Sequence, residues 1–305
     1  MQAPLELTVP AEAAGRRLDA WLAETARAGS RALVQQAIDD GRVLVDGRPR
    51  QKGFRLSGGE RLSADFTMEP GAQAPIAAEP RIAFEDNSLL VVDKPPGVVV
   101  HPAPGHRAET LVEFLSRRAA GAWEPLVVHR LDKDTSGLML VAKQADVQRT
   151  LQQQIRRREV EREYLALVEG RLEARTGTID APLGRHPRRR TRMSIETSKP
   201  RPARTHFAVE RFIGDFTLVR ARLETGRTHQ IRAHFAALGH PVAGDPEYGT
   251  RGLLGLERQF LHSGRIAYPH PQSGRRFEHR SELPPDLASA LERAGAPVDQ
   301  PPATS

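Results

Sequence analysis

The stretch HRLDKDTSGLMLVAK, residues 129–143, places a dense group of polar and charged side chains beside an apolar run. The runs Leu126–His129 and Leu138–Ala142 are rich in aliphatic and β-branched residues and predict two strands. A loop held between rigid strands is a common place for reactive groups. Asp134–Gly137 is also a good turn sequence, and Asp132 could simply cap that turn or pair with a neighbouring cation. The residues alone leave both interpretations open.

Strand-like runs continue on both sides of this loop. Short β-branched or aromatic runs, split by turn residues, predict further strands at Ile82–Phe84, Leu89–Asp93, Val98–Val100, Tyr164–Val168, Thr205–Phe212 and Phe216–Glu224. Gly214-Asp215, between the last two, predicts a hairpin. Helical spacing of apolar residues predicts two helices, around 147–155 and 231–238. Strands grouped into hairpins with few helices predict an α+β domain, with a mainly antiparallel or mixed sheet flanked by helices and loops.

The first 64 residues have the pattern of a small α-rich domain. Ser30 stands at an N-cap position ahead of a second helical run that ends at Gly41, and Asp46-Gly47 then favours a tight hairpin. Residues 16–62 hold ten Lys or Arg and six Asp or Glu, a surplus of 10 − 6 = 4. On charge alone, an ordinary solvated face explains this surplus better than a binding surface does.

Composition between and after these regions predicts the domain boundaries. Residues 65–81 carry three prolines among Ala, Gly and Gln and predict a linker. From Ala294 onward the composition is that of a frayed end. We therefore expect a domain at 1–64, a linker at 65–81, a larger domain at 82–293 and a flexible tail at 294–305.

Length and composition exclude several classes of protein. A chain of 305 residues is long enough for two domains, and 45 Lys plus Arg against 38 Asp plus Glu give a net charge of +7. A polyanion is therefore the first partner to consider. The absence of cysteine excludes disulfides and thiolate chemistry. A hydrophobic fraction of 39% and a mean hydropathy of −0.48, with no secretory signal, predict a soluble cytoplasmic protein without a membrane partner.

The loop at 129–143 and the segments around it resemble the RluA/RluD family of RNA pseudouridine synthases. Further blocks carry the resemblance in the family's order: EDNSLLVVDKPPGVVVHP (85–102), REVEREYLALVEG (158–170), LETGRTHQIRAHFAALGHPVAGD (223–245) and LHSGRIAYPHP (261–271). Two short helices followed by a hairpin, with arginines between them, resemble an S4 RNA-binding domain. Such a domain precedes the catalytic domain in the RluD-like branch of the family.

The resemblance implies roles for four side chains. Asp132 would be the essential carboxylate, and Arg232 its basic partner. Tyr164 would face the bound base, and Arg130 would fill the gap that the displaced nucleotide leaves. A nearby guanidinium keeps a partly buried carboxylate ionised and fixed in place. Stacking on Tyr164, worth about 1–3 kcal/mol per base, would offset much of the cost of taking uridine out of its stack.

Other residues are candidates for RNA binding. Residues 185–204 hold eight Lys or Arg and one Glu, a surplus of 8 − 1 = 7 that equals the net charge of the chain. Such a tract is usually a solvated loop, but in an RNA enzyme it would contact phosphates. The candidates are Arg130, His129, Arg227, Arg185, His186, Arg188, Arg189, Arg190 and Arg192, with Arg16, Arg17, Arg31 and Arg42 in the S4-like domain. His129 is first interpreted as a structural hydrogen-bonding residue.

The activity that the resemblance implies is the isomerisation of uridine to pseudouridine in RNA. Nothing is added or removed, so no cofactor and no metal is expected. Asp132 could attack C1′, add to C6 of the uracil or abstract the 2′ proton, and the sequence does not choose among these routes. We expect a monomer that acts on 23S rRNA, with tRNA or both RNAs as the alternative. A non-catalytic ribosome-assembly factor is a second hypothesis, and a metal-dependent phosphodiesterase a third, although no HExxH motif supports it.

Overall fold

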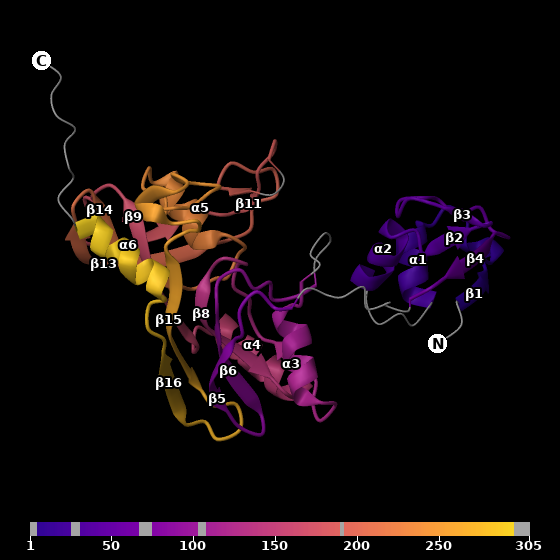
Figure 1. The fold of residues 1–305 in the computed structure, drawn as a ribbon, viewed down its shortest axis with the longest axis horizontal. Coiled ribbons are helices and arrows are strands. Elements are labelled where there is room, and N and C mark those ends of the chain that lie inside the picture. Colours follow the sequence, from indigo (N-terminus) through magenta and orange to yellow (C-terminus); the bar gives the residue numbers. More distant parts are fainter. Residues whose placement is uncertain (1–4, 26–30, 67–74, 103–107, 190–191, 296–305) are drawn as a thin grey trace, which may run out of the picture. The chain divides into compact units, whose positions relative to one another are not determined.

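The computed structural model describes residues 5–25, 31–66, 75–102, 108–189 and 192–295. These residues form two compact units, one drawn from 1–75 with 101–109 and the other from 76–100 with 110–305 (Figure 1). Ser30 and Arg190, named above, lie outside the described residues, as do 67–74 of the expected linker.

The first unit packs two short helices on a small sheet. Its elements are β1 (Leu5–Thr8), η1 (Ala11–Ala13), α1 (Leu18–Thr25), α2 (Arg31–Asp39), β2 (Val43–Val45), β3 (Arg48–Pro49) and β4 (Arg61–Ala64). The strands pair antiparallel in the order β1-β4-β2-β3. The hairpin predicted at Asp46-Gly47 is confirmed, because both residues take positive φ, 50° and 73°, between β2 and β3. Both helices and strands β2 and β4 contribute to one apolar core.

The second unit is built on a large sheet with helices on it. Its elements are β5 (Arg81–Glu85), β6 (Leu89–Lys94), α3 (Leu111–Ala119), β7 (Leu126–Val127), β8 (Ser136–Ala142), α4 (Ala145–Arg156), β9 (Glu161–Glu169), β10 (Thr176–Asp180), β11 (Gly184–Arg185), β12 (Met193–Ser194), β13 (Arg204–Ile213), β14 (Phe216–Leu223), α5 (Gln230–Ala237), η2 (Leu253–Gly255), β15 (Leu261–Pro269), β16 (Arg276–Arg280) and α6 (Pro285–Gly295).

The large sheet is mixed, as expected. Its strands run in the order β10-β13-β14-β9-β15-β8-β6-β5, with β16 paired to β15 and β7 to β8. The pairing of β15 with β8 is parallel, and the other pairings of this sheet are antiparallel. Gly214, with a φ of 54°, closes the predicted hairpin between β13 and β14. The α+β fold class is therefore confirmed.

Strand β6 is buried on both faces, which explains its unbroken apolar sequence. Leu90 and Val92 pack in one cluster, to which α3 contributes, whereas Leu89 and Val91 pack in another with α4. Side chains alternate between the faces of a strand, so a strand covered on both sides loses the alternation of apolar and polar residues. Strand β8, which follows the Asp132 loop, is buried along its whole length for the same reason.

The structure corrects four sequence-based predictions. Val98–Val100 is not a strand, because the carbonyls of Val99 and Val100 accept hydrogen bonds from the first two amides of α3. The strand expected at Leu126–His129 is only the two-residue β7. The prediction of two helices in this domain omitted α3 and α6. Ala294, expected to open the tail, is buried within α6.

Candidate active site

A cavity of about 280 Å³ opens where the loop before β8, strand β9 and the start of α5 meet. Five sequence-predicted residues line it: His129, Arg130, Asp132, Tyr164 and Arg227. These side chains converge because β15 lies between β8 and β9 in the sheet and pairs with both. Segments that are far apart in the chain therefore form a single site.

Two buried cations hold the loop that carries Asp132. Lys94 Nζ donates to the carbonyl oxygen of Lys133 at 2.8 Å, and Arg258 Nη1 donates to that of Asp134 at 2.9 Å. The loop is therefore tied through its backbone to the sheet and to the segment before β15. The Asp132 side chain remains 17% exposed. Its ion pair is with an arginine from α5 and not with a neighbour in the loop, so the carboxylate does not merely cap a turn.

Arg232 contacts three carboxylates. Its Nη1 lies 3.4 Å from Asp132 Oδ2, while Nε and Nη2 bind the two carboxylate oxygens of Asp245 at 2.6 and 2.8 Å. Glu247 lies 3.3 Å away. Burial lowers the pKa of Arg232, but these carboxylates more than offset it and the pKa is raised. The bidentate pair with Asp245 fixes the plane of the Arg232 guanidinium, and the third guanidinium nitrogen, Nη1, faces Asp132.

Asp245 was not identified from the sequence. It is fully buried, and its Oδ1 also accepts the backbone N–H groups of Glu247 and Tyr248. Its place thirteen residues after Arg232, beyond the end of α5, carries no local signal of this pairing. The arginine that the resemblance assigned to Asp132 thus makes its two shortest hydrogen bonds to Asp245.

Tyr164 and Arg162 point to the same face of β9. Both are buried, with 4% and 3% of their surface exposed, and both line the cavity. Burial raises the pKa of Tyr164, whose phenol hydrogen-bonds to Ser263. The phenol is therefore uncharged at neutral pH. Burial lowers the pKa of Arg162. Arg162 was not singled out from the sequence, although it stands two residues before Tyr164.

His129 is fixed by the backbone of β8. Its Nε2 accepts the N–H of Leu140 at 3.2 Å, so the ring proton lies on Nδ1, which has no acceptor among the described residues. Burial, with a smaller contribution from the nearby Arg162 charge, lowers the pKa of His129 to about 3. The ring is therefore neutral at any physiological pH, and as a structural hydrogen-bond acceptor it offers no acid–base chemistry there.

Comparison with known proteins identifies the family. Residues 88–237 match the family model described as RNA pseudouridylate synthase, and residues 16–62 match the S4 domain model. The chain is 41% identical over 297 residues to "Uncharacterized RNA pseudouridine synthase YlyB" of Bacillus subtilis, covering 94% of this chain and 97% of that protein. This chain belongs to the RNA pseudouridine synthase family. The predicted S4 domain and the predicted enzyme class, an isomerase, are confirmed.

Further relatives support the same family assignment. The chain is 42% identical to "Ribosomal large subunit pseudouridine synthase D" of Nitrosomonas europaea, over 94% of this chain and 87% of that protein. It is 38% identical to the protein of the same name from Escherichia coli, over 94% of this chain and 93% of that protein. The solved structure of "Human RNA Pseudouridylate Synthase Domain Containing 1" is 30% identical, with a TM-score of 0.57, over 73% of this chain and 90% of that one.

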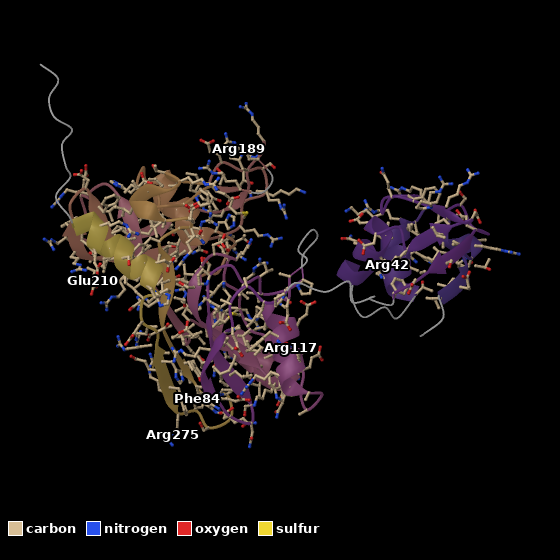
Figure 2. All side chains as sticks on the ribbon, in the orientation of Figure 1. Arg42, Phe84, Arg117, Arg189, Glu210 and Arg275 are labelled. Atoms are coloured by element: carbon tan, nitrogen blue, oxygen red, sulfur yellow. The ribbon has the colours of Figure 1, made fainter. Side chains whose placement is uncertain are left out.

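In this synthase the basic tract forms a hairpin beside the cavity. Arg185 and His186 line a groove of about 800 Å³ next to β11 and β12, and Arg227 lines both this groove and the cavity that holds Asp132. Arg188 and Arg189 are exposed, and Figure 2 shows Arg189 at the outer end of this segment. Their contact with RNA stays a prediction.

Arg192 connects the same hairpin to the active site. Its guanidinium carbon lies 4.4 Å from the centre of the Tyr248 ring, and that of Arg232 lies 5.1 Å from it. The Tyr248 hydroxyl accepts the N–H of Met193 in β12 and contacts His229 Nδ1 at the start of α5. Tyr248, which the sequence did not single out, therefore joins the basic hairpin to the helix that carries Arg232.

The arginines predicted to contact RNA in the S4 domain pair with acidic residues of that domain. Arg16 pairs with Glu24, Arg17 with Asp19 and Arg42 with Asp40; the side chain of Arg31 lies outside the described residues. Of these pairs only Arg16–Glu24 has both side chains exposed, and such a pair is worth at most about 1 kcal/mol, so a phosphate can displace it; Asp19, by contrast, is fully buried. Arg42 is labelled in Figure 2.

Metal sites and membrane spans are two other features that bear on function. Among the described residues, no group of three or more His, Cys, Asp or Glu side chains is arranged to hold a metal ion. No helix in the same residues combines the length and apolar character that crossing a bilayer requires.

Proposed function

We propose that this synthase isomerises uridines of the large-subunit ribosomal RNA, 23S rRNA, and that Asp132 is its reactive carboxylate. Two kinds of observation support the RNA substrate. Relatives over most of the chain are named for the large ribosomal subunit. The chain also combines an S4 domain with a basic groove that shares Arg227 with the catalytic cavity.

The arrangement of Asp132, Arg232 and Asp245 carries the proposal. Asp245 orients the guanidinium through two short hydrogen bonds, so Arg232 can attract Asp132 with a single nitrogen at 3.4 Å. The second oxygen of Asp132 has no hydrogen bond within the described residues. A carboxylate that is fixed on one side and open on the other can act on a substrate as nucleophile or base.

The cavity sets how the uridine must arrive. The Asp132 carboxylate and the buried Tyr164 ring both line this cavity, and an enzyme reaches the reacting atoms of a stacked nucleotide only after the base has been flipped out. The target must therefore leave its helix, with its base beside the buried Tyr164 ring. Arg130 is exposed at the edge of the same cavity, where it can enter the space that the nucleotide vacates.

The reaction is an internal rearrangement. The N1–C1′ bond breaks, the uracil turns, and a C5–C1′ bond forms; the C5 proton is lost and N1 gains one. Asp132 attacks C1′, adds to C6 or takes the 2′ proton, and in each case is regenerated. Every atom of the product comes from the uridine or, for exchanged protons, from acid–base groups and water, so the rearrangement requires no cofactor.

The Asp132→Asn variant tests the role of the carboxylate. Asparagine has the same shape but is neither a base nor a comparable nucleophile, so we expect product formation on an rRNA transcript to fall by about 10⁴-fold or more, with RNA affinity retained. Pseudouridine mapping and a binding titration measure the two quantities. An unaltered rate would remove Asp132 from the mechanism. A wild-type protein that binds RNA without forming product would instead support the assembly-factor hypothesis.

The substrate is tested separately in cells. Pseudouridines in rRNA and tRNA are mapped with and without the protein, and we expect at least one large-subunit position to lose its modification. Loss of a tRNA position with every rRNA position intact would contradict the rRNA assignment and leave the chemistry untouched.

A further inference from the structure

Arg162 is a buried cation without a counter-ion. It lies on β9 with 3% of its surface exposed, lines the catalytic cavity and has no hydrogen bond or ion pair among the described residues. Its Nε is fully enclosed and has no acceptor there. Two other arginines are similarly buried, and both are paired: Arg232 with Asp245 and Arg258 with Asp286. Arg162 is therefore the exception among the buried arginines of the described chain.

The neighbouring His129 offers Arg162 no hydrogen-bond acceptor. The one unprotonated nitrogen of His129 already accepts the Leu140 N–H, and its Nδ1–H also has no acceptor among the described residues. A side chain at Gly226 would place a Cβ 2.9 Å from Arg162 Nη1, so glycine there leaves room beside the guanidinium. An enclosed charge without a partner is costly, which indicates that a bound ligand supplies the missing acceptor.

The degree of burial indicates which part of the RNA reaches Arg162. Arg130 and Arg156 line the same cavity but are exposed, so they are accessible to the charged backbone of an RNA outside it. Arg162 is enclosed and lies two residues from Tyr164 on the same strand face. A base that enters the cavity therefore meets Arg162 before any phosphate can. Uracil has two carbonyl oxygens, O2 and O4, that accept hydrogen bonds.

Each route open to Asp132 places negative charge on these oxygens. When the N1–C1′ bond breaks, the electron pair stays on N1 and is shared with O2 and O4. When Asp132 adds to C6, the pair moves through C5 to O4. Fixed donors at a developing oxyanion, in a site with little water, are among the strongest sources of catalysis.

We infer that Arg162 donates hydrogen bonds to a carbonyl oxygen of the flipped uracil and stabilises the negative charge on the base until C5 bonds to C1′. This inference rests on the proposed function. It makes Arg162 a catalytic residue for the isomerisation, distinct from Arg232, which holds Asp132.

The Arg162→Gln variant tests the inference. We expect the single-turnover rate at saturating rRNA transcript to fall by about 10²–10³-fold, with Kd within about threefold of the wild type. Arg162→Lys keeps the charge but not the two-pronged donor, and should recover part of the rate. Arg222→Gln removes an exposed arginine from β14 and serves as the matched control with an unchanged rate. An unchanged single-turnover rate in Arg162→Gln overturns the inference. So does a variant whose RNA affinity alone falls, with a weaker salt dependence of Kd, because that result indicates a phosphate contact.

Thermal unfolding separates catalysis from a structural role. Removal of an unpaired buried charge should leave the Tm of Arg162→Gln equal to or above that of the wild type. A lower Tm, or failure to fold, would show that Arg162 serves the fold and would overturn the inference.

Sulfur substitution in the substrate locates the contact. Transcripts carry 2-thiouridine or 4-thiouridine at the target, since sulfur accepts hydrogen bonds more weakly than oxygen. We expect one of the two substitutions to slow the wild type and to have no further effect in Arg162→Gln. Independent effects at both positions contradict the contact. Absence of product from wild type on the unmodified transcript would contradict the proposed function, whereas an active wild type and an equally active Arg162→Gln contradict only the inference.

Discussion

At the residue scale, the site depends on the different hydrogen bonds that Arg232 makes to Asp245 and to Asp132, two of the three carboxylates around it. Asp245 takes the two short hydrogen bonds of Arg232 and is fully buried, while Asp132 takes the longer one and keeps contact with the cavity. Charge-assisted bidentate pairs are the stronger and more directional kind. The buried carboxylate therefore fixes the arginine, and the partly exposed one remains available for chemistry.

His129 makes the stability of the fold sensitive to acid. His129 is half-buried with its Nδ1 enclosed, and this burial lowers its pKa from an ordinary 6.5 to about 3, so between these values the unfolded chain holds a proton that the folded protein lacks. The free energy of unfolding therefore rises with pH across this window. The contribution of this histidine to stability is lost as the pH falls from 6.5 toward 3. For His129→Gln we expect a slope smaller by about 1.4 kcal/mol per pH unit between pH 4 and 6.

Urea unfolding at a series of pH values measures this slope. Above pH 7 the two proteins should show parallel profiles, because the histidine is neutral in both states, and this range is the internal control. Equal slopes below pH 6 would contradict the burial of a neutral His129.

At the element scale, the contact between β8 and β15 leaves no room for a side chain. Gly137 has a φ of 108°, and a Cβ there would lie 2.3 Å from the carbonyl oxygen of Ser263. Gly137→Ala must push apart the two strands that hold the Asp132 loop beside Tyr164. We expect a loss of more than about 3 kcal/mol in the free energy of unfolding, and a loss of activity with it.

Gly121→Ala is the matched control for this substitution. Gly121 also has a positive φ, 83°, but a Cβ added there would have no atom of the described residues within 4 Å. Only the backbone conformation is then penalised, at about 1–2 kcal/mol. Denaturant unfolding followed by circular dichroism compares the two, and equal losses would show that the strand contact is not the cause.

Elements with a strong local pattern were predictable from the sequence. The hairpin at Gly214-Asp215 and the helix over 147–155 follow from turn residues and apolar spacing. Helix α3 was missed although Thr110 and Glu113 form a capping box at its start, a signal that the sequence contains. The error at Val98–Val100 has a different cause, because those residues have strand-like side chains but their carbonyls serve the first turn of α3.

At the scale of the whole molecule, the site could be predicted only in part. The family's motifs pointed to Asp132, Tyr164 and Arg232, for which the residue types alone favoured ordinary structural roles. Asp245 and Arg162 were not found, because their importance lies in which partner each has or lacks in three dimensions. A pairing of this kind depends on strand order and on the return of the chain after α5, and no local pattern encodes either.

The charge of the chain is also a property of the whole molecule. The surplus of seven cations in residues 185–204 equals the net charge of +7, so the remaining charges cancel. Three of these cations, Arg185, Lys199 and Arg201, line a groove that shares Arg227 with the Asp132 cavity. RNA affinity should therefore depend on this hairpin more than on any other part of the second unit.

Arg189→Ala tests this dependence against a control at the other end of the same unit. Arg189 and Arg275 are both exposed and are labelled at opposite ends of the second unit in Figure 2. A lost phosphate contact lowers affinity and reduces the slope of log Kd against log salt by about 0.7–1. We expect that change for Arg189→Ala and none for Arg275→Ala, with both keeping the wild-type single-turnover rate at saturating RNA. Titrations at several salt concentrations measure the slope. Equal slopes in all three proteins would place the RNA elsewhere, and a reduced rate at saturation would mean that the hairpin also positions the target uridine.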